Sequence, residues 1–215
     1  MEQLYPGLLQ ALADNGQHPP FVMFDCSDSR VSEPLIFSSR PGDIFTARNI
    51  ANQFQEDDIT STSVLGYAVE HLQVKHVIVM GHYGCGGIQA AILPPPSQSS
   101  PADEAVQRWI QPIRELYHNS TRQEIVAFRE SRSQKLDLHA PAFRALVEEN
   151  VKSNVLRISA SDIIKEHYTS SPEKPVFIHG FVYDIESGKV CDLRVSIGPP
   201  GVDVPIVPLP GVEEL

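Results

Sequence analysis

Cysteine is scarce in this sequence, and a long hydrophobic run is absent. Three cysteines in 215 residues are too few, and odd in number, for a disulfide framework. We therefore expect a reducing compartment, the cytoplasm, in which the thiols stay free for metal binding or chemistry. The longest apolar stretch, residues 76–81, is far shorter than the about 20 residues that span a bilayer, so no membrane segment is expected. Residues 1–6 lack the basic and apolar regions of a secretory signal.

Basic residues are also in the minority. The chain has 17 lysines and arginines against 27 aspartates and glutamates, and its formal net charge is -10. Such a surface repels a phosphate backbone, so we expect no nucleic-acid partner. Hydrophobic residues make up 41% of the chain, which is enough for one packed core. We predict a single domain over residues 1–215.

The first half of the chain contains a strand, helix, strand pattern. Residues 21–24 are a short apolar run, which is typical of a strand buried on both faces in a parallel sheet. Residues 43–48 are a second strand candidate. Residues 61–72 predict a helix with an apolar stripe, capped by Thr60, Ser61 or Thr62. The strand 76–80 follows at once. This order predicts a βαβ unit with parallel strands.

The remaining segments complete an α/β prediction: a central, mostly parallel sheet flanked by helices, with a C-terminal strand hairpin. Glycine-rich residues 81–87 predict a turn, and proline-rich residues 94–101 predict a polar loop. The other predicted elements are a short N-terminal helix or arm within residues 1–16, helices over 103–164 broken near Pro141, strands at 176–183 and 189–195 joined by a turn at 186–188, and an extended tail over 198–215.

Two cysteines and a histidine directly follow two of the predicted strands. Cys26 follows one strand, and His82 and Cys85 follow another. Ligands bind at the carboxyl ends of strands in open α/β sheets, and thiolates with imidazole favour tetrahedral zinc. Three protein ligands leave one position open, as in a catalytic zinc site. The alternative is that these cysteines are small buried hydrophobic residues, an interpretation that fits Cys191 well.

Asp28 and Arg30 stand two and four residues beyond Cys26, in a polar run that a core strand would not tolerate unpaired. An aspartate beside a guanidinium stays ionised and can orient a metal-bound water. A structural salt bridge is the alternative, and the local sequence does not separate the two.

Several segments together resemble the β-carbonic anhydrases. Residues 26–30 (CSDSR) and 81–87 (GHYGCGG) resemble the two signature segments of that family. The match is extended by residues 41–45 (PGDIF), 48–52 (RNIAN), 67–74 (YAVEHLQV) and 179–184 (HGFVYD), so that it covers about residues 17–195.

The resemblance implies a zinc lyase, a carbonic anhydrase that hydrates CO2 reversibly to bicarbonate and a proton. It implies one zinc ion per subunit on Cys26, His82 and Cys85, with Asp28 and Arg30 as the catalytic dyad beside the metal. Zinc lowers the pKa of its water toward about 7 and so supplies hydroxide at neutral pH. A hydrogen bond to Asp28, itself held by Arg30, would position that nucleophile.

The same resemblance implies a substrate pocket. Gln17 matches a glutamine whose amide binds a substrate oxygen, and Gly86 matches a backbone N–H near the zinc. Phe45, Ile50 and Tyr67 match apolar wall positions suited to a nonpolar gas. Taken singly, these three apolar residues would be interpreted as core and Gln17 as an ordinary loop residue.

The type of site and the assembly are further expectations. Bacterial members with bicarbonate-controlled closure carry tryptophan three residues before the first zinc cysteine, whereas this chain has Met23. The segment around it resembles the plant-type members, so we expect an open site. The pocket of the family lies at a dimer interface, which implies a homodimer or a higher homo-oligomer. Only about sixteen residues precede Gln17, which predicts a short N-terminal arm.

Two other functions remain open at this stage. The same zinc site is compatible with another small heterocumulene, CS2 or COS. The chain is also compatible with a weakly active or non-catalytic zinc protein related to CO2 or bicarbonate, although the presence of all three ligands and the dyad argues against it.

Overall fold

The computed structural model describes residues 4–131, 137–206 and 212–214. The strands are β1 (Phe21–Cys26), β2 (Ile44–Asn49), β3 (His76–His82), β4 (Phe177–Asp184), β5 (Lys189–Ile197) and β6 (Val212–Glu214). The helices are α1 (Leu8–Asn15), α2 (Glu33–Ile36), α3 (Ile59–Gly66), α4 (Gly86–Ile92), α5 (Pro101–Trp109), α6 (Gln111–Asn119), α7 (Gln123–Glu130), α8 (Pro141–Ala160) and α9 (Asp162–Ser170). A 3-10 turn, η1 (Ile50–Asn52), and a π turn, η2 (Tyr67–His71), complete the elements.

The strands form one sheet in the order β2-β1-β3-β4-β5-β6. β2, β1, β3 and β4 are parallel neighbours, β5 returns antiparallel to β4, and β6 pairs parallel with β5. The predicted α/β fold, its parallel sheet and its C-terminal hairpin are confirmed. Within the described part of the chain, β2 is an edge strand.

Burial on both faces explains why the central strands are mostly apolar. Every residue of β1 and of β3 is buried. Val22 and Phe24 face the larger of two hydrophobic clusters, and Phe21 and Met23 face the smaller one. Alternate side chains therefore leave the strand on opposite faces, as the pleat of a β-strand requires.

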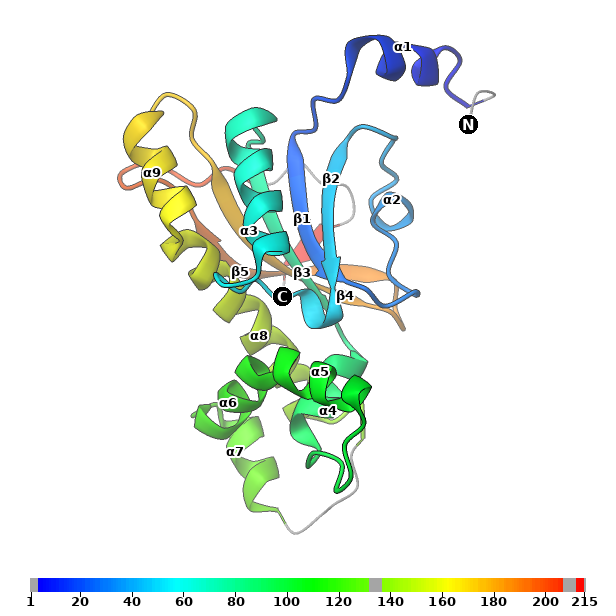
Figure 1. Cartoon of the computed structure of the whole chain (residues 1–215), viewed down its shortest axis with the longest axis vertical. Helices are drawn as coiled ribbons and strands as arrows, with labels where there is room; N and C mark the ends of the chain where they lie inside the picture. Colours follow the sequence, from blue (N-terminus) through cyan, green and yellow to red (C-terminus); the bar gives the residue numbers. More distant parts are fainter. Residues whose placement is uncertain (1–3, 132–136, 207–211, 215) are drawn as a thin grey trace.

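Helices cover the two faces unequally (Figure 1). α3, α8 and α9 lie on the face of the larger cluster, and α4 to α7 gather below the end of the sheet at which β1, β2 and β3 finish. Phe37, which directly follows α2, packs in the smaller cluster on the other face. Figure 1 also shows α1 at the edge of the molecule, where Leu12 lies beside Gly42; none of the residues of α1 is buried.

The boundaries of several helices differ from the prediction. α3 begins at Ile59 because the carboxylate of Asp58 accepts the N–H groups of Thr60 and Ser61, so the predicted cap at Thr60, Ser61 or Thr62 is wrong. The predicted glycine-rich turn ends early, because α4 already begins at Gly86. The helical region predicted to end near residue 164 continues to Ser170, and its described residues form the five helices α5 to α9.

Both ends of the chain only partly follow the prediction. The N-terminal helix is confined to Leu8–Asn15 and follows Gly7, which has a φ of 75°. Residues 202–206 have no regular secondary structure, while β6 adds a short strand to the predicted tail. Residues 1–3, 207–211 and 215 lie outside the described part of the chain. In the part that the structure describes, no helix is long and apolar enough to cross a membrane.

Candidate metal centre

The three predicted metal ligands meet at the carboxyl end of the parallel sheet. Cys26 is the last residue of β1, His82 is the last residue of β3, and Cys85 is the residue that precedes α4. β1 and β3 are adjacent parallel strands, so their ends lie side by side. All three side chains are buried, and their donor atoms lie within 4.8 Å of one another.

The donor atoms fit a tetrahedral zinc ion. The Sγ atoms of Cys26 and Cys85 are 3.9 Å apart, close to the about 3.8 Å that Zn–S bonds of about 2.3 Å give at a tetrahedral angle. Nδ1 of His82 lies 3.0 Å from the carbonyl oxygen of Tyr83. This contact assigns the ring proton to Nδ1, because a carbonyl oxygen only accepts. Nε2 of His82 is buried, has no hydrogen-bond partner among the described residues and is left with a free lone pair.

The environment of the two thiols lowers the pKa of Cys26 and raises the pKa of Cys85. A hydrogen bond from Cys85 and the neighbouring His82 lower the pKa of Cys26, although burial opposes them. The thiol that donates this bond has its own pKa raised, so the two sulfurs share one proton in the absence of a cation. N–H groups of Gly87 and Ile88, in the first turn of α4, stabilise the thiolate of Cys85. Thiolate is the form that binds a metal.

Asp28 lies beside this cluster and is held by Arg30. Its Oδ1 accepts the backbone N–H of Arg30 at 3.0 Å and the Nε–H at 2.9 Å, while its Oδ2 accepts Nη2 at 2.7 Å. The same Nη2 donates to the carbonyl of Gly84 at 3.1 Å. Oδ2 of Asp28 is 3.7 Å from Nε2 of His82. The hydrogen bonds from Arg30 hold the pKa of Asp28 well below its usual range.

Two carbonyl groups of the turn after β3 matter here and were not singled out from the sequence. The carbonyl of Tyr83 orients His82, and the carbonyl of Gly84 orients Arg30. The phenol of Tyr83 donates to Glu148 on α8 at 2.9 Å, and its ring lies under the guanidinium of Arg144 at 3.5 Å. A backbone carbonyl carries no residue signature, so the sequence indicated only a glycine-rich turn that resembles a signature segment of the family.

The predicted pocket residues are divided between the two ends of the sheet. Gln17 and Tyr67 line a hollow of about 560 Å³ near the start of β1, and the rings of Phe45 and Tyr67 are 5.8 Å apart. Phe45 pairs in register with Val22, four residues before the end of β1. Six extended residues span about 16 Å, so this group does not reach the metal cluster of its own chain.

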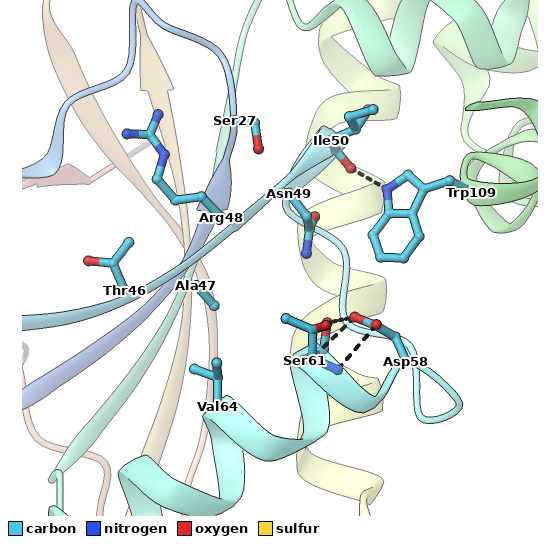
Figure 2. A pocket seen from close by; sticks show the side chains of 11 residues that line it. Ser27, Thr46, Ala47, Arg48, Asn49, Ile50, Asp58, Ser61, Val64 and Trp109 are labelled. Atoms are coloured by element: carbon cyan, nitrogen blue, oxygen red, sulfur yellow. Dashed lines mark hydrogen bonds between the residues drawn. The ribbon is translucent and has the colours of Figure 1, made fainter. Parts of the chain in front are cut away.

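Ile50 and Gly86 lie at the opposite end of the sheet, with the metal cluster. Gly86 is the first residue of α4, and a Cβ placed on its neighbour Gly87 would lie 2.7 Å from Cγ2 of Ile50. Ile50 also lines a groove of about 520 Å³ between β2, the start of α3 and Trp109 (Figure 2). The indole N–H of Trp109 donates to the carbonyl oxygen of Ile50 at 2.8 Å. The groove begins beside the cluster at Ser27.

The remaining cysteine takes no part in the cluster. Cys191 is half-buried on β5 and pairs in register with Val182 of β4. This position matches the strand interpretation of its sequence.

The comparisons with known proteins agree with this geometry. The chain matches the family model described as carbonic anhydrase over residues 21–190. It is 33% identical over 188 residues to a carbonic anhydrase of Emericella nidulans, a match that covers 87% of this chain and 74% of the relative.

Two solved structures show the same fold. A Coccomyxa β-carbonic anhydrase in complex with acetazolamide superposes with a TM-score of 0.78 at 28% identity, covering 91% of this chain and 81% of the other. A tetrameric β-carbonic anhydrase of the ascomycete Sordaria macrospora gives a TM-score of 0.76 at 27% identity, covering 91% and 90% of the two chains. The chain therefore belongs to the β-carbonic anhydrase family, whose activity is the reversible hydration of CO2.

Proposed function

We propose that this chain hydrates CO2 reversibly at a zinc ion held by Cys26, His82 and Cys85. The observation that carries the proposal is the buried Nε2 of His82, which lacks a partner among the described residues and lies within 4.8 Å of two thiols. A zinc ion bound there supplies Lewis acidity and a hydroxide nucleophile at neutral pH. Two thiols 3.9 Å apart must stay unoxidised to bind it, which favours a reducing compartment such as the cytoplasm.

In this proposal Asp28 fixes the direction of the nucleophile. Its Oδ2 is a carboxylate oxygen 3.7 Å from Nε2 of His82, so it can accept the proton of a hydroxyl group at the open position. The low pKa of Asp28, caused chiefly by Arg30, keeps this oxygen an acceptor throughout the neutral range. A hydroxyl group oriented in this way by Asp28 would keep a lone pair free for the carbon of CO2.

Arg30 also keeps Asp28 out of the metal position, and we infer an open site of the plant type. Both oxygens of Asp28 accept hydrogen bonds from Arg30, and Arg30 is itself anchored on Gly84. Moving the carboxylate onto the metal would break this bidentate pair. Met23, at the position of the tryptophan of the bicarbonate-controlled members, agrees with the same type of site.

We propose that the substrate pocket forms between two copies of the chain. Gln17, Phe45 and Tyr67 lie at one end of the sheet and the metal cluster lies at the other, so one copy would supply the former to the cluster of its partner. Within the described residues β2 is an edge strand, and apolar side chains beside it are exposed to solvent. Tyr67 is 48% exposed and Ile50 is 38% exposed. Exposed apolar side chains along an unpaired edge are typical of an interface.

Each pocket residue then has a defined role. Phe45, Ile50 and Tyr67 would form the nonpolar wall for CO2, Gln17 would donate its amide to a substrate oxygen, and the N–H of Gly86 would lie beside the cluster. The tetrameric state of the Sordaria macrospora relative supports assembly beyond the dimer. We propose the dimer as the minimal active unit.

Stopped-flow CO2 hydration tests the proposal directly. The zinc-loaded wild type should accelerate hydration, Cys26→Ala should lose both zinc and activity, and Asp28→Asn should keep zinc while kcat falls about 10- to 100-fold. Asp162→Asn is the matched control, because Asp162 forms an exposed pair with Lys165 on α9 and belongs to neither half of the proposed pocket. A zinc-loaded wild type that hydrates CO2 at the uncatalysed rate would show the proposal to be wrong.

A further inference from the structure

One side chain outside the metal cluster holds the whole loop that carries Cys26 and Asp28. Arg48, on β2, donates to the carbonyl of Cys26 from Nε at 3.1 Å and from Nη2 at 2.8 Å. Its Nη2 also lies 2.9 Å from the carbonyl of Asp28 and 2.7 Å from that of Val31. The guanidinium therefore spans the loop from its metal ligand to its last residue.

The register of the sheet explains why Arg48 reaches this loop. Arg48 is paired with Asp25 across β1 and β2, one residue before the end of both strands. Figure 2 shows its side chain on the same side of β2 as Ser27, and Asp58 and Ser61 on the other side. Arg48 thus faces the loop, whereas Asp58 and Ser61 belong to the start of α3.

A buried carboxylate lies on the other side of the guanidinium. The side chain of Glu33, at the start of α2, is only 5% exposed, and its Oε2 is 3.5 Å from Nη1 of Arg48. Oε1 of Glu33 and Oδ2 of Asp25 are buried without a hydrogen-bond partner among the described residues. A buried carboxylate is stable only with a compensating charge, so Glu33 depends on its ion pair with Arg48. Arg48 in turn binds the loop through hydrogen bonds to its carbonyl groups.

We propose that Arg48 and Glu33 are a positioning pair that holds Cys26 and Asp28 at their distances from His82 and Cys85. Neither residue is placed at the substrate or at the metal; Glu33 fixes Arg48, and Arg48 fixes the three carbonyls. The proposal rests on the proposed function, because the reaction is what this loop geometry serves. Lysine should not replace Arg48, because one ammonium group cannot bind the carbonyls through one nitrogen while also supplying the Nε–H that Cys26 accepts and the Nη1 that contacts Glu33.

The test compares Arg48→Gln, Arg48→Lys and Glu33→Gln with the wild type, all zinc-loaded. Arg40→Gln is the matched control, because Arg40 pairs with Asp43 on the surface at 3.5 Å. Two amides report on the loop: Ser27 N–H donates to Asn49 O at 2.9 Å, and Val31 N–H donates to Asp28 O at 3.0 Å. Hydrogen exchange at these amides is measured together with kcat, KM and zinc affinity in competition with a chelator.

Both Arg48 variants should lower kcat about 10- to 100-fold with KM nearly unchanged, and should weaken zinc binding. Exchange of the Ser27 and Val31 amides should become about tenfold faster or more, while the amides within β3 keep their wild-type rates. Glu33→Gln should change the same quantities by a smaller factor, and Arg40→Gln should change none of them.

Wild-type exchange at Ser27 and Val31 in the Arg48 variants would overturn the proposal. So would faster exchange throughout the sheet, with activity lost only in proportion to the folded protein, because that result shows a purely structural role. Exchange and zinc affinity require no turnover. If the wild type failed to hydrate CO2, the proposed function would fail, and these two measurements would still decide the role of the pair.

Discussion

At the scale of single residues, the parts of the site differ in how much of them the sequence carries. Cys26, His82 and Cys85 each end or follow an apolar strand, and the ends of neighbouring parallel strands meet, so their convergence could be predicted. The role of Arg48 could not be predicted from the sequence. It depends on the register of β2 against β1 and on backbone carbonyl groups, which carry no residue signature. The role of Glu33 could not be predicted either, because glutamate is rarely buried and Glu33 is 4% exposed.

A pair of buried histidines away from the site makes stability depend on pH. His179 is 1% exposed, and its ring nitrogens lie 3.1 Å from Nδ1 of His76 and 3.0 Å from Oγ of Ser196. Burial, with His76 adding to it, lowers the pKa of His179 to about 3. The pKa of His76 is also lowered by burial. The folded state therefore binds fewer protons than the unfolded state at acidic pH.

The stability that neutral His179 contributes is present above its unfolded pKa of about 6.5 and is lost as the pH falls from there toward about 3. Between pH 7 and pH 5 the wild type should lose about 2 kcal/mol more than His179→Gln in urea unfolding. The exposed His118→Gln should behave as the wild type. Equal losses for His179→Gln and the wild type would contradict this assignment.

At the scale of elements, the type of each long element could be predicted and its boundaries could not. Thr60, Ser61 and Thr62 are all capping residues by type, so the local sequence did not distinguish them from Asp58. Asp58 prevails because its carboxylate accepts two backbone N–H groups and the hydroxyl of Ser61. A charged acceptor at the start of a helix also interacts favourably with its dipole.

The contact between α8 and the sheet depends on glycine in the strands. A Cβ on Gly180 of β4 would lie 2.6 Å from Cγ1 of Val195, 3.0 Å from Cγ1 of Val151 and 3.2 Å from Cγ2 of Val155. Gly180→Ala should therefore destabilise the protein by about 1–3 kcal/mol, because α8 and β5 must both move. Chemical denaturation of the two proteins measures the difference.

Gly66→Ala is a control of the opposite sign for this experiment. In α3 a Cβ at that position would meet only Cδ1 of Ile163, at 3.8 Å, so the change should be neutral or stabilising by up to about 1 kcal/mol. A Gly180→Ala protein as stable as the wild type would show that α8 packs less closely than the structure indicates.

At the scale of the whole molecule, the sheet separates the two halves of the proposed pocket. A single domain over residues 1–215 remains our proposal, supported by a core cluster that includes residues as distant as Val22 and Val182. The family resemblance implied the pocket residues, but not that Gln17, Phe45 and Tyr67 lie at the end of the sheet opposite the metal cluster. That separation follows from the direction of β1, which begins just after Gln17 and ends at Cys26.

A pocket shared between two copies predicts complementation. Gln17→Ala and Asp28→Asn should each have low activity alone. In a mixed dimer one site combines the intact Asp28 of one copy with the intact Gln17 of the other. Mixing the variants under exchange conditions should restore about a quarter of the wild-type activity, since half of the dimers are mixed and one of their two sites is intact. Activity no higher than the mean of the two variants would argue for a pocket within one chain.

The most direct test of the central claim is a zinc titration of the metal-free protein. At each zinc concentration, the rate at which labelled CO2 loses ¹⁸O is measured. The geometry of Cys26, His82 and Cys85 predicts a rate that rises linearly with added zinc and levels off at one ion per chain, with no rise in Cys85→Ser. A chain that binds one zinc ion and still exchanges ¹⁸O at the uncatalysed rate would contradict it.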